Sequence, residues 1–117
     1  MTTIKSYTDL EQSKKLAEFL PIESADHFHI IGHLHTDGPR YEVIRPRNEI
    51  VETDKYWPCW SLSALLAILR DYTLQTNTDG TVFVVCDSKK PMISDAYDNP
   101  VDACVAMIEC LHELNLL

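Results

Sequence analysis

A chain of 117 residues with 45% hydrophobic and 24% charged residues has the composition of a single globular domain, which excludes a disordered chain. Its formal net charge of −8 opposes binding to nucleic acid and to anionic membranes, because those affinities come mainly from Lys and Arg. The charge keeps a small domain soluble, and it also suits a basic partner.

The cysteines and the N-terminus indicate the compartment. Four cysteines occur without a C-x-x-C pair, each in an apolar or helical segment, which is typical of reduced thiols: Cys59, Cys86, Cys104 and Cys110. Residues 1–5 lack the apolar core of a signal peptide, and no segment approaches the ~18 apolar residues of a membrane span. The sequence therefore predicts a cytoplasmic protein.

The first predicted element is a helix that follows Thr8. The run Thr8–Glu11 has the spacing of a capping box, in which the Thr8 hydroxyl and the Glu11 carboxylate satisfy each other's backbone N–H groups. Pro21 cannot follow Leu20 in a helix, so the element ends there. It is expected to be amphipathic and superficial.

The next stretch predicts a β-hairpin. Apolar and polar residues alternate over residues 27–35, as in a half-buried strand. Thr36–Pro39 has turn chemistry, and residues 41–45 continue as a second strand that Pro46 closes. The short apolar pair Ile50–Val51 could add a brief edge strand.

Residues 56–72 contain the longest apolar run, which predicts a helix deep in a packed layer. Its leucines, at positions 62, 65, 66 and 69, follow the 3.6-residue period of one helix face. Trp57 and Trp60 stand just before them and are expected to fix where the helix enters, with partners for their indole N–H groups where buried.

The last third of the chain predicts two strands and a helix. Thr73–Gly80 is interpreted as a polar loop, Thr81–Cys86 as a central strand, and Pro91–Tyr97 as a strand near an edge. Asn99 as N-cap and Pro100 at the first helical position start the final helix. Its apolar stripe comprises Val101, Cys104, Val105, Ile108, Leu111 and His112.

These elements predict an α+β fold in the order α-β-β-α-β-β-α. Three helices pack on an antiparallel sheet of about four strands, because both β-β pairs have short connections. No repeat or linker divides the chain, so residues 1–117 form one domain. A partly exposed sheet edge is expected, and a two-fold homodimer is the usual way to cover excess apolar surface.

Four segments resemble a family of small proteins encoded by gut bacteria and by their phages or integrated mobile elements. They are Tyr7–Glu18, Leu20–Asp26, Pro58–Leu62 and Tyr97–Val105, which contain 33 of the 117 residues and occur in the same order. The family has no assigned activity, so the resemblance implies only a phage-like, cytoplasmic context. The hairpin of residues 27–47 lies outside these segments.

The hairpin carries the most suggestive cluster of potential metal ligands. Period-two spacing places four imidazoles on one strand face, where neighbours about 6–7 Å apart could share a Zn²⁺: His27, His29, His33 and His35. Asp26 or Asp37 could add an oxygen ligand. A solvated, pH-sensitive strand face is the competing interpretation, because no distant Cys or His pair completes a structural zinc site.

Other candidates are weaker. Cys59 beside a helix start could be a nucleophile of a hydrolase, but between Pro58 and Trp60 a packed thiol fits better. Ser61 is interpreted as a capping hydroxyl. The residues expected to contact a ligand are Arg40, Arg45, Trp57 and Trp60, with the arginines suited to phosphate or carboxylate.

The acidic C-terminal quarter could bind a basic partner. Its carboxylates are Asp95, Asp98, Asp102, Glu109 and Glu113. Two functional hypotheses follow: a non-enzymatic interaction protein of a phage or mobile element, acting for example in counter-defence and dimeric, or a small-ligand or metal-binding module built on the histidine face.

Overall fold

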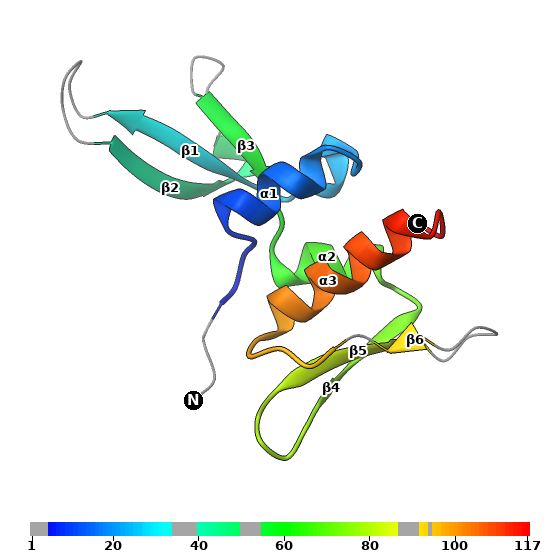
Figure 1. Ribbon diagram of the computed structural model, residues 1–117. Helices are drawn as coiled ribbons and strands as arrows, with labels where there is room; N and C mark the ends of the chain where they lie inside the picture. Colours follow the sequence, from blue (N-terminus) through cyan, green and yellow to red (C-terminus); the bar gives the residue numbers. More distant parts are fainter. Residues whose placement is uncertain (1–4, 34–39, 50–54, 87–91, 94) are drawn as a thin grey trace.

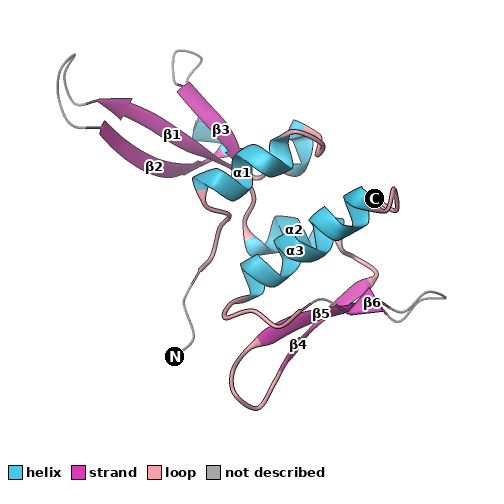
Figure 2. Cartoon of the chain, viewed as in Figure 1, coloured by secondary structure: helices cyan, strands magenta, loops and turns pink. Residues whose placement is uncertain are grey.

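The computed structural model describes residues 5–33, 40–49, 55–86, 92–93 and 95–117, and places α2 and α3 between two small sheets (Figure 1, Figure 2). The helices are α1 (Leu10–Ala17), α2 (Leu62–Ile68) and α3 (Pro100–Glu113), with 3-10 turns η1 (Ile22–Ser24) and η2 (Arg47–Glu49). The strands are β1 (His27–His33), β2 (Arg40–Pro46), β3 (Lys55–Cys59), β4 (Tyr72–Thr76), β5 (Val82–Cys86) and β6 (Met92–Ile93). The molecule is elongated, with extents of 53 × 33 × 22 Å.

The α+β class with three helices is confirmed, but the strands form two three-stranded antiparallel sheets instead of one sheet of about four. The orders are β2-β1-β3 and β4-β5-β6. Two strands were not predicted. The first is β3, because Lys55–Cys59 pairs antiparallel with β1. In this pairing Cys59 lies opposite His27. The predicted edge strand at Ile50–Val51 lies outside the described residues.

The second new strand, β4, corrects the predicted polar loop at residues 73–80. Tyr72 and Leu74 are half-buried and alternate with exposed neighbours, so β4 pairs with β5 from Tyr72↔Cys86 to Thr76↔Val82. Asp79-Gly80 is a recognised hairpin signal, and Gly80 adopts φ 91°, which a side chain would disfavour. The predicted strand 91–97 is reduced to β6, with Tyr97 in an isolated bridge to Val82.

The helices begin where capping chemistry predicts with one shift, and α1 ends at Ala17 instead of the predicted Leu20. Asn99 caps α3 by accepting from Asp102 N, with Pro100 in the first turn, as predicted. The cap of α1 is Asp9, in a capping box with Gln12, and not Thr8. Tertiary contacts claim Thr8 instead: its N–H donates to Trp60 O at 2.9 Å, and its hydroxyl accepts from Trp60 N at 3.1 Å.

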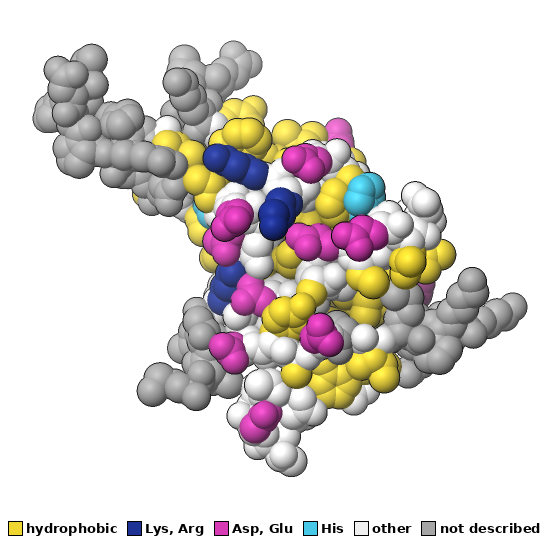
Figure 3. Space-filling view, in the orientation of Figure 1, with side chains coloured by type: hydrophobic (Ala, Val, Ile, Leu, Met, Phe, Trp, Pro, Cys, Tyr) yellow, Lys and Arg dark blue, Asp and Glu magenta, His cyan; other side chains and the backbone are white. Residues whose placement is uncertain are grey.

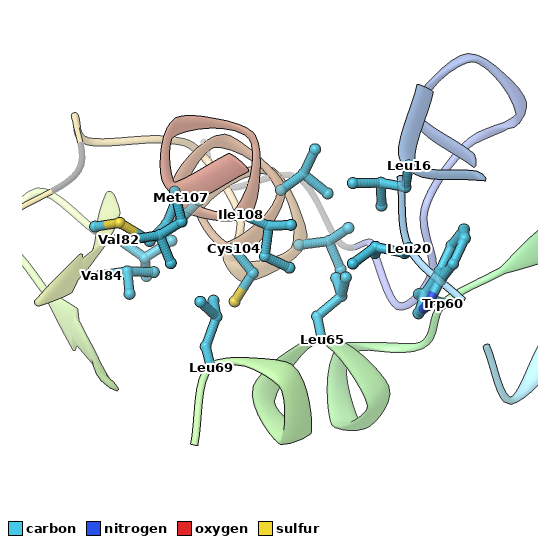
Figure 4. Close-up of a cluster of buried hydrophobic side chains, with 14 of the residues drawn as sticks. Leu16, Leu20, Trp60, Leu65, Leu69, Val82, Val84, Cys104, Met107 and Ile108 are labelled. Carbon is cyan, nitrogen blue, oxygen red and sulfur yellow. The ribbon is translucent and has the colours of Figure 1, made fainter. Parts of the chain in front are cut away.

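The core lies where the three helices meet β5 (Figure 4). Leu16 of α1, Leu65 of α2 and Ile108 of α3 are fully buried there, together with Trp60. The helix predicted in residues 56–72 does pack into the core through Leu65, but seven residues of α3 are buried against this single residue of α2, so α3 is the more deeply buried helix. The reason is position, since α3 packs on both β5 and α2. No described helix has the length and apolarity to cross a bilayer.

Candidate interaction groove

A polar network joins the N-terminal segment, α1 and α3. Asp102, in the first turn of α3, accepts from Lys5 Nζ and from Gln12 Nε2, each at 2.8 Å, and from Asn99 Nδ2 at 2.9 Å. Lys5 Nζ also lies 3.0 Å from Asp9 Oδ2. Asp9 and Asp102 therefore both contact Lys5, and the bond from Gln12 to Asp102 connects α1 to α3.

These contacts shift the pKa values of all three ionisable groups toward the charged form. Burial raises the pKa of Asp102, but the hydrogen bonds from Lys5, Gln12 and Asn99 outweigh it and hold the pKa below its usual value. The pKa of Asp9 is lowered in the same way, against burial. Burial opposes the charge of Lys5, yet its two carboxylate partners raise its pKa. The network is therefore ionised at neutral pH.

Two adjoining hollows beside this network form a surface between α1 and α3, which we name the α1–α3 groove (Figure 3). Their volumes are about 370 and 410 Å³, and Lys15 and Glu109 line both. The acidic side chains of the lining are Asp9, Glu11, Glu18, Asp102, Glu109 and Glu113, and the basic ones are Lys5 and Lys15. Six carboxylates and two lysines leave a net charge of −4, half of the chain's −8.

The second hollow has an aromatic wall. The rings of Phe19 and His112 stack with centroids 3.9 Å apart and an interplanar angle of 8°. Phe19 is partly buried against the core, and His112 belongs to the last turn of α3. His112 therefore lies exposed beside the groove, and the predicted stripe of α3 is buried at its other five positions.

The predicted histidine face is partly covered by the N-terminal segment. His29 is 6% exposed, and its Nε2 lies 2.8 Å from Thr8 O, so this nitrogen carries the hydrogen because a carbonyl can only accept. His27 Nδ1 lies 3.1 Å from Asp26 Oδ1 without hydrogen-bond alignment, and its ring meets Tyr7 edge to face. His29 is thus a buried hydrogen-bond donor, whereas His27 lies beside Asp26 and Tyr7.

The zinc hypothesis for this face stays a prediction. Among the described residues, no group of three or more His, Cys, Asp or Glu side chains is placed to hold a metal ion. His33 ends β1, but its side chain, like the whole of His35 and Asp37, is outside what the structure describes.

Asp26 organises the start of α2. It accepts from Ser61 N at 2.9 Å and from the Ser61 hydroxyl, while Ser61 Oγ accepts from Ala64 N at 3.2 Å. Burial raises the pKa of Asp26, but the hydrogen bonds from Ser61 and the nearby His27 outweigh burial and hold the pKa below its usual value. In a nucleophilic triad the histidine would contact the serine, whereas here Asp26 lies between them. Ser61 is therefore a capping residue, as predicted.

Cys59 is a packed thiol. It is fully buried, and its Sγ lies 3.8 Å from Thr8 Oγ1 and 3.6 Å from Thr8 O. Burial raises the pKa of the Cys59 thiol to about 11, so a thiolate is not available at neutral pH for the hydrolase hypothesis. Cys59, Cys104 and Cys110 are free thiols.

Of the four residues expected to contact a ligand, the two tryptophans lie in different surroundings. Trp60 is fully buried and donates from Nε1 to Ser24 Oγ at 2.9 Å, whereas Trp57 is 40% exposed with Lys14 Nζ 5.2 Å from its ring. Arg45 is exposed on β2, and Arg40 begins that strand with its side chain not described. The neighbouring Arg47 instead donates from Nη1 to carbonyls of residues 22, 23 and 25.

The sequence singled out the acidic residues of α3 but missed their partners on the other side of the groove. Lys5, Gln12 and Phe19 carried no signal, because only the packing of α1 against α3 brings them together. The sequence indicated Asp102 only as one carboxylate of the acidic C-terminal quarter. No family, curated protein or solved structure gives a match to this chain.

Proposed function

We propose that this chain is a non-enzymatic binding protein whose α1–α3 groove receives a basic segment of a partner protein. The observation that carries the proposal is the net charge of −4 concentrated along two adjoining hollows. Complementary potentials speed encounter and reject wrong partners, so such a groove favours Lys- and Arg-rich ligands.

The distribution of contacts supports a binding role for the outer carboxylates. Asp9 and Asp102 are held by Lys5. Four others form no ion pair with any described residue: Glu11, Glu18, Glu109 and Glu113. They remain available to a partner's lysines and arginines. The stacked rings of Phe19 and His112 add a flat surface for the aliphatic part of such side chains.

The biological setting belongs to the same proposal. The resemblance of four segments to proteins of gut bacteria and their phages supports a cytoplasmic accessory protein of a phage or mobile element. Its partner is then a host or phage protein, and counter-defence is a role consistent with that setting. The proposal includes a two-fold homodimer, because two small sheets leave several strand edges open.

The test is fluorescence anisotropy of a fluorescein-labelled decalysine peptide titrated with the full chain. Glu109 lines both hollows, so Glu109→Lys is expected to weaken binding by at least about fivefold. Glu23→Lys, on the exposed turn η1, is the matched control, since it changes the net charge equally outside the groove.

The control should bind within about twofold of the wild type. Equal losses in both variants would show that the peptide responds to overall charge alone. Absence of binding at low ionic strength, where exposed charges are least screened, would also reject the groove as a basic-peptide site.

A further inference from the structure

The four outer strands of the two sheets differ in how well they resist pairing with another chain. β2 carries Arg45 and Pro46, and β3 carries Pro58. β6 has only two residues. β4, with the sequence Tyr-Thr-Leu-Gln-Thr, has neither a charge nor a proline. Charges and prolines are the usual protection of an exposed edge, so β4 is the unprotected one.

The hairpin turn shows which backbone groups of β4 point to this open edge. Asn77 N donates to Thr81 O at 2.8 Å and Gly80 N donates to Asn77 O at 3.0 Å, which closes a type I turn followed by Gly80 with positive φ. Hydrogen-bonded and non-hydrogen-bonded pairs alternate along an antiparallel ladder. Counting from Asn77, the N–H and C=O groups of Leu74 and Thr76 face away from β5.

We propose that a second copy of this chain pairs antiparallel with β4 across a two-fold axis at Leu74. Tyr72 then lies opposite the second copy's Thr76, and the two sheets join in the order β6-β5-β4-β4-β5-β6. This pairing keeps the half-buried face of each β4, with Tyr72 and Leu74, on one side of the joined sheet.

Charge complementarity at the ends of β4 selects a second copy as the occupant. The register brings each hairpin tip, Asn77–Gly80, toward the segment that precedes the other β4. Exposed Arg70 there meets exposed Asp79, and Asp71 meets the amide of Asn77. The hydroxyl and the N–H of Thr81 hold the pKa of Asp79 below its usual value, so Asp79 is charged at neutral pH.

A hollow of about 260 Å³ beside Arg70 and Tyr72 can receive the hairpin tip of the second copy. Its lining includes Arg70 and Tyr72 as well as Leu116, which is 52% exposed. One strand and one hairpin tip bury less than the ~1,600 Å² of a standard interface, so the dimer should dissociate on dilution.

This inference rests on the dimer included in the proposed function, but not on the groove, so the peptide assay and the following test can fail separately. The mass of the full chain is measured by sedimentation velocity over a dilution series. Thr76→Pro removes an N–H that faces the open edge and no bond to β5, so it should weaken dimerisation at least about tenfold and leave the monomer folded.

Thr78→Pro is the matched control, because position 78 is the second residue of the type I turn, where proline is favoured. It should retain the wild-type dimer. Arg70→Glu leaves the strand intact and should also weaken the dimer by repelling Asp79. Hydrogen exchange at the amides of Leu74 and Thr76 should slow as concentration rises.

A wild-type chain that stays monomeric throughout the dilution series overturns the proposal. So does a Thr76→Pro variant that dimerises like the wild type, or exchange at Leu74 and Thr76 that is independent of concentration. A monomer that still binds decalysine would leave the groove proposal standing and remove only the β4 dimer.

Discussion

Asp102 offers the sharpest test of how α1 and α3 are joined. Asp102→Asn keeps the shape of the side chain but removes the charge that receives three donors, from Lys5, Gln12 and Asn99. A hydrogen bond to a charged group contributes about 1.5–3 kcal/mol when buried. We expect Asp102→Asn to lower the free energy of unfolding, because a neutral amide oxygen is a weaker acceptor and leaves Lys5 with Asp9 alone.

The magnitude has to be reduced for solvent. The side chains of Asp102 and Lys5 are 32% and 21% exposed, and exposed ion pairs contribute only about 0.2–1 kcal/mol. The asparagine also retains part of the hydrogen bonding. We therefore expect a loss of about 1–2 kcal/mol, which lowers Tm by about 3–8 °C for a domain of this size.

The loss should depend on pH at both ends of the scale. The folded pKa of Asp102 is lowered, so its stabilisation is present above the unfolded pKa of about 3.9 and disappears as pH falls through the folded value. The folded pKa of Lys5 is raised, so its share is present below 10.5 and is lost as pH rises through the folded value. Wild type and variant should therefore differ at pH 7 and converge in strong acid.

Urea denaturation followed by circular dichroism from pH 2 to pH 8 measures this difference. Asp98→Asn is the control, because Asp98 is exposed, lies four residues away and is outside the network. Equal effects of the two substitutions at pH 7, or a difference for Asp102→Asn that persists at pH 2, would refute the reasoning.

Three further predictions concern packing and caps. Asn115 follows α3 with φ 56°, and the bonds from Leu116 N to Leu111 O and from Asn115 N to His112 O complete a Schellman motif. In thermal melts, Asn115→Gly should therefore raise the free energy of unfolding slightly, and Asn115→Ala should lower it by about 1 kcal/mol. Leu65→Ala should cost about 2–5 kcal/mol because Leu65 is fully buried, whereas Ser63→Ala on the exposed side of α2 should cost far less. Iodoacetamide followed by peptide mass mapping should label exposed Cys110 well before Cys59, and equal labelling rates in the folded protein would contradict the burial of Cys59.

Local chemistry predicted the elements whose signals lie within a few residues of each other. Asn99 and Pro100 fixed the start of α3 because an N-cap acts on its own first turn. The alternation of apolar and polar residues over positions 27–35 likewise predicted the strand β1. β4 was not predicted although Tyr72 and Leu74 alternate with polar residues and Asp79-Gly80 follows, because Leu74 is the only apolar residue between positions 73 and 80.

Contacts distant in sequence explain the remaining errors. The spacing of residues 8–11 predicted Thr8 as the N-cap of α1. The backbone and hydroxyl of Thr8 instead form hydrogen bonds with Trp60, 52 residues away, and Asp9 is the N-cap. Trp57 and Trp60 were both expected at the entry of α2, but only Trp60 is buried in the core. Sequence spacing cannot show which of several suitable partners a hydroxyl or an indole finds.

The sequence by itself determined the class of fold, the N-cap of α3 and the acidic character of the C-terminal quarter, because periodicity, turn chemistry and charge are local properties. The tertiary structure alone decided that the strands divide into two sheets and that α1 closes on α3 over Asp102. Register and strand order depend on pairing between separate segments, and Lys5 meets Asp102 although the two residues lie 97 positions apart. The groove between α1 and α3 therefore exists only in the folded chain.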